Sequence, residues 1–81
     1  MNSNVDSKFI LVFGKNLKRI RESKSISQDN LSYVSEISKN QVGLIERGKI
    51  NTSIDTVLKL AIALEVPIDE LFNFDYKKKP K

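Results

Sequence analysis

Four polar residues without an acid among them follow one another in the middle of the chain: Ser38, Lys39, Asn40 and Gln41. Asparagine and glutamine side chains can form two hydrogen bonds with adenine, lysine can donate to guanine, and serine can bond to either. A helix surface that meets only water more often alternates acidic and basic residues. If these residues share an exposed helix end, the chemistry that they offer is hydrogen bonding to the edges of DNA bases.

The surrounding stretch, Ser27 to Gly48, predicts two short helices that must position these side chains. Ser27 and Ser38 can each cap a helix N-terminus, because a serine oxygen accepts a hydrogen bond from an amide of the first turn. Gly48 suits the left-handed position that ends a helix. Two helices of about two turns, joined by about three residues, must cross steeply, and this is the helix-turn-helix arrangement.

Apolar residues at helical spacing predict which side of each helix is buried. Leu31 and Val34 form the expected buried stripe of the first helix. The expected buried side of the second helix consists of Ile37, Val42 and Ile45. Its opposite face then presents a mostly polar set: Lys39, Asn40, Gly43, Leu44 and Arg47, with Gln41 at the margin.

Gly43 stands in the middle of the second helix, where a glycine costs roughly 1 kcal/mol relative to alanine. Such a loss is understandable if a phosphate or a base edge approaches the helix backbone closely at this point. The alternative is a tolerated surface glycine, and the sequence leaves both interpretations open.

The same segment resembles the helix-turn-helix of the phage-repressor and Cro-like (XRE-type) regulators, whose pattern is roughly S-Q-x-x-L-A-x-x-x-G-V-S-x-x-x-I-x-x-I-E-x-G. The corresponding residues here are Ser27, Gln28, Leu31, Ser32, Glu36, Ile37, Ser38, Val42, Ile45, Glu46 and Gly48. The resemblance extends from about Phe13 to about Phe72. It implies an all-α fold, namely a compact five-helix lambda-repressor-like DNA-binding domain.

The sequence departs from this family pattern at two positions. Ser32 replaces the usual alanine and is still small enough for a close contact between the helices. Glu36 replaces the usual glycine of the turn. If the turn geometry of the family is kept, Glu36 must hold a positive φ, at a cost on the order of 1 kcal/mol. We therefore expect a less stable turn of the same geometry.

Three further helical elements are predicted outside this motif. The first begins at Asp6 or Ser7 and continues to about Ser23. Another follows a cap at Ser53, and a short helical turn covers residues 68–72. Helical spacing directs a set of apolar side chains of the first helix toward the core: Phe9, Phe13, Leu17 and Ile20.

The expected organisation is a disordered N-terminus at 1–6, a helix-turn-helix DNA-binding domain at 7–74 and a basic flexible tail at 75–81. The apolar turn at 9–13 is expected to pack against the C-terminal segment, with a contact between subunits as the alternative. Two interpretations of the apolar residues near the C-terminal end stay open, a twofold contact between copies or packing within the core. The residues concerned are Leu64, Val66, Leu71, Phe72, Phe74 and Tyr76.

Composition and charge narrow the possible functions. The 81 residues carry a formal charge of +4, with a basic stretch at 15–26 and an acidic one at 53–73. This uneven distribution suits a protein of which one side faces phosphates. The chain contains no cysteine or histidine, which removes the commonest general base and the usual zinc ligands. The adjacent acids Asp69 and Glu70 would not face each other on a helix, so we predict no catalytic residue, cofactor or metal.

The residues and the resemblance together suggest roles for individual side chains. Base contacts are expected from Ser38, Lys39, Asn40, Gln41 and Leu44, the last against a thymine methyl group. Phosphate contacts are expected from Gln28, Arg47, Lys49, Asn51 and Thr52. The resemblance also implies a partly buried ion pair, Arg21 with Glu46, that holds the recognition helix against the first helix.

We therefore expect a sequence-specific, double-stranded DNA-binding transcriptional regulator that acts in the cytoplasm as a homodimer. Its recognition helix would enter the major groove of a near-palindromic operator whose half-sites lie about 34 Å apart. A phage-type repressor and a restriction–modification controller both fit this expectation. The alternative is a protein-interaction module of the same fold, such as an antitoxin, with a protein partner and secondary DNA binding.

Overall fold

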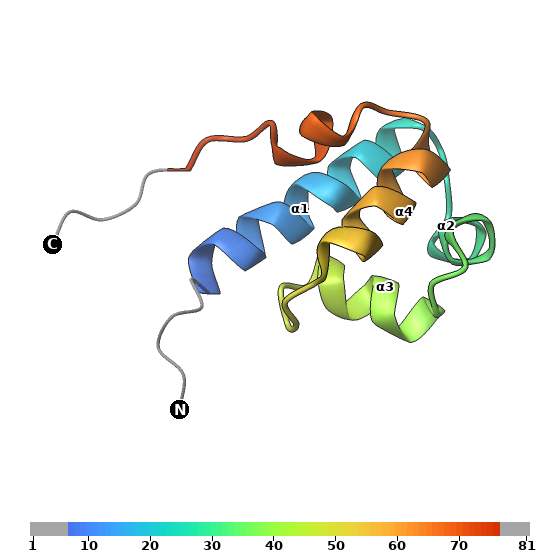
Figure 1. The fold of residues 1–81 in the computed structure, drawn as a ribbon, viewed down its shortest axis with the longest axis horizontal. Coiled ribbons are helices and arrows are strands. Elements are labelled where there is room, and N and C mark those ends of the chain that lie inside the picture. Colours follow the sequence, from blue (N-terminus) through green and yellow to red (C-terminus); the bar gives the residue numbers. More distant parts are fainter. Residues whose placement is uncertain (1–6, 77–81) are drawn as a thin grey trace, which may run out of the picture.

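The computed structural model describes residues 7–76, which form helices joined by short turns (Figure 1). The α-helices are α1 (Ser7–Ser23), α2 (Gln28–Ser35), α3 (Lys39–Glu46) and α4 (Ile54–Leu64), and a 3₁₀ helix, η1 (Ile68–Phe72), follows them. The all-α class is confirmed. The predicted count of five helices was slightly wrong, because the fifth element of the described chain is this 3₁₀ turn. The predicted disordered N-terminus and most of the predicted tail lie outside the described residues.

The elements pack against one another in pairs. α3 contacts both α1 and α2, α4 contacts α2, and η1 lies against α1 and α4. Serine caps begin three of the helices, as predicted. The hydroxyl oxygens of Ser27, Ser38 and Ser53 accept hydrogen bonds from the amide three residues later, at 3.0, 3.1 and 3.1 Å. Each cap satisfies an amide that the helix itself leaves without a partner.

The turn between α2 and α3 has the left-handed geometry that the family pattern predicts. Glu36 has φ 62° and ψ 30°, and its amide donates to the Ser32 carbonyl. The Ser32 hydroxyl in turn donates to the Ile37 carbonyl at 2.5 Å, which ties the end of α2 to the turn. The Glu36 side chain is exposed, so nothing in the interior compensates the steric cost of a Cβ at positive φ.

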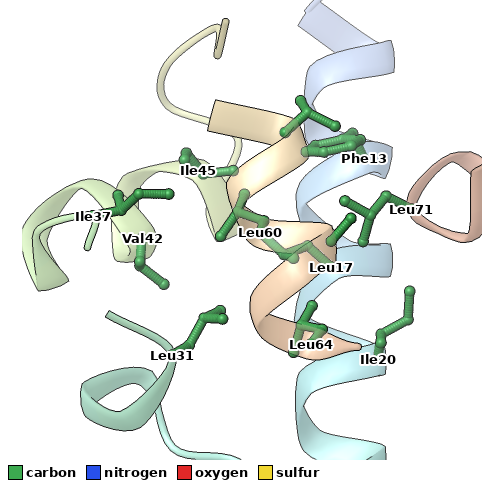
Figure 2. Close-up of a cluster of buried hydrophobic side chains, with 12 residues drawn as sticks. Phe13, Leu17, Ile20, Leu31, Ile37, Val42, Ile45, Leu60, Leu64 and Leu71 are labelled. Carbon is green, nitrogen blue, oxygen red and sulfur yellow. The ribbon is translucent and has the colours of Figure 1, made fainter. Parts of the chain in front are cut away.

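The hydrophobic core lies between the inner sides of the α-helices, with Leu31 of α2 and Leu71 of η1 also directed into it (Figure 2). The prediction for α2 was wrong at Val34, whose side chain is 53% exposed. Burial in α2 instead follows the i, i+4 spacing from Leu31 to Ser35. Ser35 can occupy the inner position because its hydroxyl accepts a hydrogen bond from the Ile37 amide at 3.3 Å. The apolar residues of the core cluster are Phe13, Leu17, Ile20, Leu31, Ile37, Val42, Ile45, Val57, Leu60, Ala61, Leu64 and Leu71.

The N-terminal turn of α1 packs against the C-terminal segment, as predicted. The Phe9 ring centroid lies 5.5 Å from that of Phe74 and 5.1 Å from that of Tyr76. Leu64 and Leu71 are fully buried in the core. These two leucines therefore belong to the interior, and they are not available for a contact between copies.

Asn16 attaches η1 to α1, a role that the sequence analysis did not anticipate. Its side chain is buried, and Nδ2 donates to the carbonyl oxygens of Glu70 and Leu71, both at 3.0 Å. Its Oδ1 accepts from Arg19 at 2.7 Å. A buried amide that finds partners on both sides costs little and specifies one position of the partner segment.

Glu36→Gly is expected to raise the free energy of unfolding by about 1 kcal/mol, because glycine adopts a positive φ without a steric conflict. Urea unfolding of both proteins measures the difference. The matched control is Glu22→Gly in the last turn of α1, where glycine should lower stability by up to about 1 kcal/mol. A Glu36→Gly protein that is less stable than the wild type would show that this turn is not strained.

Candidate nucleic-acid interface

The outer face of α3 lies at the edge of the molecule. In Figure 1, α3 forms the lower margin and no other labelled helix lies beyond it. Val42 and Ile45 are 0% and 1% exposed, so the core determines which side of α3 faces inward. Lys39 and Asn40 lie on the exposed side. The polar start of α3 is therefore accessible to a macromolecular ligand.

The predicted base-contacting residues are not equally exposed. Ser38, Lys39 and Asn40 are exposed, whereas Gln41 and Leu44 are half-buried. The Ser38 oxygen accepts from the Gln41 amide at 3.1 Å. Its hydroxyl hydrogen remains available to donate, so Ser38 can cap the helix and bind an acceptor at the same time.

Lys39 has a partner in α2. Its Nζ lies 3.1 Å from Oδ1 of Asp29, but the two side chains are 60% and 75% exposed. An exposed pair of this kind contributes at most about 1 kcal/mol. Lys39 can therefore exchange this carboxylate for an acceptor on a ligand at little cost.

A shallow depression gathers side chains from both helices of the motif. It is lined by Gln28 of α2 and by Lys39, Asn40, Gly43 and Arg47 of α3. It brings together two residues predicted to contact bases and two predicted to contact phosphates. Gly43, which was expected to be exposed, is buried because the Arg47 side chain covers it.

Beneath this surface, Arg21 of α1 and Glu46 of α3 form a buried ion pair. Arg21 Nε lies 2.6 Å from Glu46 Oε2, and Nη2 lies 3.0 Å from Oε1. The residues are only 7% and 4% exposed. The hydrogen bond with Glu46 raises the pKa of Arg21, although burial acts in the opposite direction. Two parallel hydrogen bonds from the Arg21 guanidinium hold the end of α3 on α1.

Gln28 provides a third hydrogen bond to the Glu46 carboxylate, in addition to the two from Arg21. Its Nε2 donates to Glu46 Oε1 at 2.9 Å. An ionised carboxylate contains only acceptors, so the amide nitrogen must be the group that faces it. One amide hydrogen of Gln28 remains for another acceptor, such as the phosphate predicted from the sequence.

The end of α3 is closed by Gly48, which has φ 70°. The Gly48 and Lys49 amides donate to the carbonyls of Ile45 and Leu44 at 3.0 and 2.9 Å. This is the Schellman arrangement, in which glycine at the left-handed position ends the helix. A Cβ at position 48 would lie 2.8 Å from the Leu11 Cα, so α1 also approaches the backbone here.

The three loop residues predicted to hold phosphate lie in different environments. Lys49 and Asn51 are exposed, whereas Thr52 is half-buried. The Thr52 hydroxyl oxygen is buried and has no hydrogen-bond partner among the described residues. The first two side chains are thus directed toward solvent, and the third is turned inward.

Gly14, like Asn16, has a structural role that the sequence analysis did not anticipate. A Cβ there would lie 2.7 Å from the Glu46 carbonyl oxygen and closer still to that of Ile45. The backbones of α1 and α3 therefore touch, and only glycine permits this approach. A glycine inside a helical pattern is a signal for such a contact, and it could have been used.

The chemistry of this surface is that of hydrogen-bond donors and positive charge. Across residues 7–76, the acidic side chains form no cluster that could hold a metal ion. None of the helices in this range is both long and apolar enough to span a membrane.

Comparison with known proteins matches residues 17–71 to the helix-turn-helix family. The chain is 37% identical over 65 residues to the control protein C.BamHI of Bacillus amyloliquefaciens, covering 79% of this chain and 80% of that protein. The structure of the restriction–modification controller protein C.AhdI from Aeromonas hydrophila gives a TM-score of 0.77 at 37% identity, covering 83% of this chain and 100% of that one. A helix-turn-helix family transcriptional regulator from Vibrio cholerae gives a TM-score of 0.80 at 32% identity, covering 84% of this chain and 38% of that one.

Arg21→Ala is expected to lower the free energy of unfolding by roughly 3–5 kcal/mol, because it leaves the Glu46 carboxylate buried without its main partner. Urea unfolding measures this loss. The double variant Arg21→Met with Glu46→Leu is the control, since removing both charges should restore much of the stability. A loss below about 1 kcal/mol in Arg21→Ala would indicate a solvated surface pair instead.

Proposed function

Because the chain belongs to the helix-turn-helix family and is a DNA-binding transcriptional regulator, not an enzyme, we propose that it binds a near-palindromic operator as a homodimer. In this proposal α3 enters the major groove of each half-site with its N-terminal residues first. The observation that carries the proposal is the exposed, acid-free start of α3 on a helix whose opposite side is held in the core. Such a helix end presents donors and acceptors in a fixed orientation.

We assign the contacts to bases and to the DNA backbone by their place on this surface. Lys39 and Asn40 are exposed at the start of α3, and with Ser38, Gln41 and Leu44 they would contact bases. Gln28 and the loop residues would contact phosphates: Lys49, Asn51 and the backbone at Thr52. The loop follows α3 directly, so it would lie beside the groove when the helix lies within it.

The support for a homodimer comes from α4. Ile54, Leu58 and Ile62 are 84%, 45% and 65% exposed, and they follow one another at intervals of one helical turn. An exposed apolar stripe of this kind is typical of an interaction site. A second copy presents the same stripe, so a twofold contact would bury both at once. Because the stripe lies on α4 and the polar surface on α3, the contact between copies and the contact with DNA would use different residues.

We further propose that the protein acts as a controller of a restriction–modification system, in the cytoplasm. The support is its similarity to two controller proteins over most of their length. A phage-type repressor role would predict an operator elsewhere in a genome. In vitro selection from random DNA duplexes, followed by a search for the recovered inverted repeat upstream of neighbouring methyltransferase and endonuclease genes, distinguishes the two roles.

Asn40→Ala is expected to remove base preference at one operator position, a loss of about 1–3 kcal/mol of discrimination. Competition binding with single-base operator variants measures this loss. Lys49→Ala is the control, because loss of a phosphate contact should weaken binding to all sequences alike and reduce the salt slope by about 1. If both variants lose affinity uniformly, Asn40 does not contact a base.

Ile62→Asn is expected to shift the protein from dimer to monomer, because it places a polar group in the stripe that the proposed dimer would bury. Sedimentation equilibrium measures the change, and operator binding should fall with it. Val34→Asn is the matched control, since Val34 is also apolar and exposed but belongs to α2 and not to the α4 stripe. Equal dimerisation of both variants would place the contact between copies elsewhere.

A further inference from the structure

Gly43 lies on the outward half of α3, yet it is buried. A Cβ built at this position would lie 3.0 Å from Arg47 Nη1, 3.8 Å from Cζ and 3.9 Å from Nη2. All three atoms belong to the guanidinium group. The Arg47 charge therefore lies over Gly43, one helical turn toward the N-terminus from the Arg47 backbone.

This position places the charge of Arg47 among the residues proposed to contact bases. The side chain shares the shallow depression with Lys39 and Asn40, and also with Gln28, which is proposed to contact a phosphate. The proposed phosphate contacts at Lys49 and Asn51 lie in the loop beyond the other end of α3. Long side chains on helices commonly point toward the N-terminus, so the orientation of Arg47 follows ordinary helix geometry.

The guanidinium is also available to bind a ligand. Within the described part of the chain, no ion pair or side-chain hydrogen bond engages Arg47. Lys39, by comparison, has Asp29 at 3.1 Å. Arg47 thus presents a planar group with several free donors on the surface that would face the groove.

We propose that Arg47 contacts a guanine base in the major groove, and that Gly43 provides the space in which its guanidinium lies along α3. This inference rests on the proposed function, and it changes the role of phosphate anchor that the sequence predicts for Arg47. Guanine has two acceptors, O6 and N7, on its major-groove edge, and two parallel N–H groups of arginine match them. If Arg47 bound a phosphate instead, its side chain would extend away from α3, and a glycine at position 43 would not be needed.

The geometry also restricts the position of this guanine. The guanidinium is level with residue 43, three residues beyond Asn40, which corresponds to about 4.5 Å along the helix axis. Successive base pairs are about 3.4 Å apart. The guanine should therefore lie within about two base pairs of the base that Asn40 contacts.

The test compares the wild type with Arg47→Ala, Arg47→Lys and Gly43→Ala on the selected operator and on operators with this G·C pair replaced. The wild type should prefer guanine by about 5- to 150-fold, as a bidentate contact does. Arg47→Ala should lose this preference and keep the preference at the Asn40 position. Arg47→Lys should keep only part of the preference for guanine, because lysine can donate to guanine but lacks the planar fork of two parallel N–H groups. Gly43→Ala should weaken the preference for guanine, because its methyl group would shift the guanidinium by a few tenths of an ångström, while its melting temperature stays equal or rises.

Lys49→Ala is the matched control for a phosphate contact. The inference is overturned if Arg47→Ala weakens all operators alike, as Lys49→Ala should, or if Gly43→Ala keeps the full preference for guanine. The absence of a guanine within two base pairs of the Asn40 position overturns it as well. In each of these cases the wild type still selects an operator, so the proposed function stands. A wild type that selects no sequence would instead overturn the proposed function.

Discussion

The Glu46 carboxylate is the group on which the outer surface of α3 depends. It lies at the end of α3 and accepts two hydrogen bonds from Arg21 of α1 and one from Gln28 of α2. A buried ion pair is tolerated only when hydrogen bonds replace the lost water, and these three donors provide that replacement. Three helices are thus joined at one point. The rotation of α3 about its axis is restricted by this contact, which determines the side chains that face outward.

Local signals were sufficient to predict most helix boundaries. Ser27, Ser38 and Ser53 were expected as caps, and each forms the expected hydrogen bond to the amide three residues later. The positive φ of Glu36 followed from the family pattern. Features of this kind depend on a few neighbouring residues, so a short stretch of sequence contains the necessary information.

Features that depend on distant segments could not be predicted in the same way. Asn16 bonds to carbonyls more than fifty positions later in the chain, and no local pattern indicates that partner. Val34 has helical spacing and an apolar side chain, yet α2 meets the domain with a neighbouring face. Gly43 was placed on the correct half of α3, but its burial depends on the conformation of the Arg47 side chain. Such details require the three-dimensional packing of the whole domain.

The function of α3 therefore depends on tertiary contacts more than on its own helical preference. A helix of eight residues is not stable alone in water. Its order comes from the Ser38 cap, from the core contacts of Val42 and Ile45, and from the ion pair of Glu46. Glu46 and Arg47 are adjacent, and one carries its charge inward while the other carries its charge along the outer face. A displacement that loosened the inner contact would also move the outer guanidinium, so base recognition can be only as accurate as the packing beneath it.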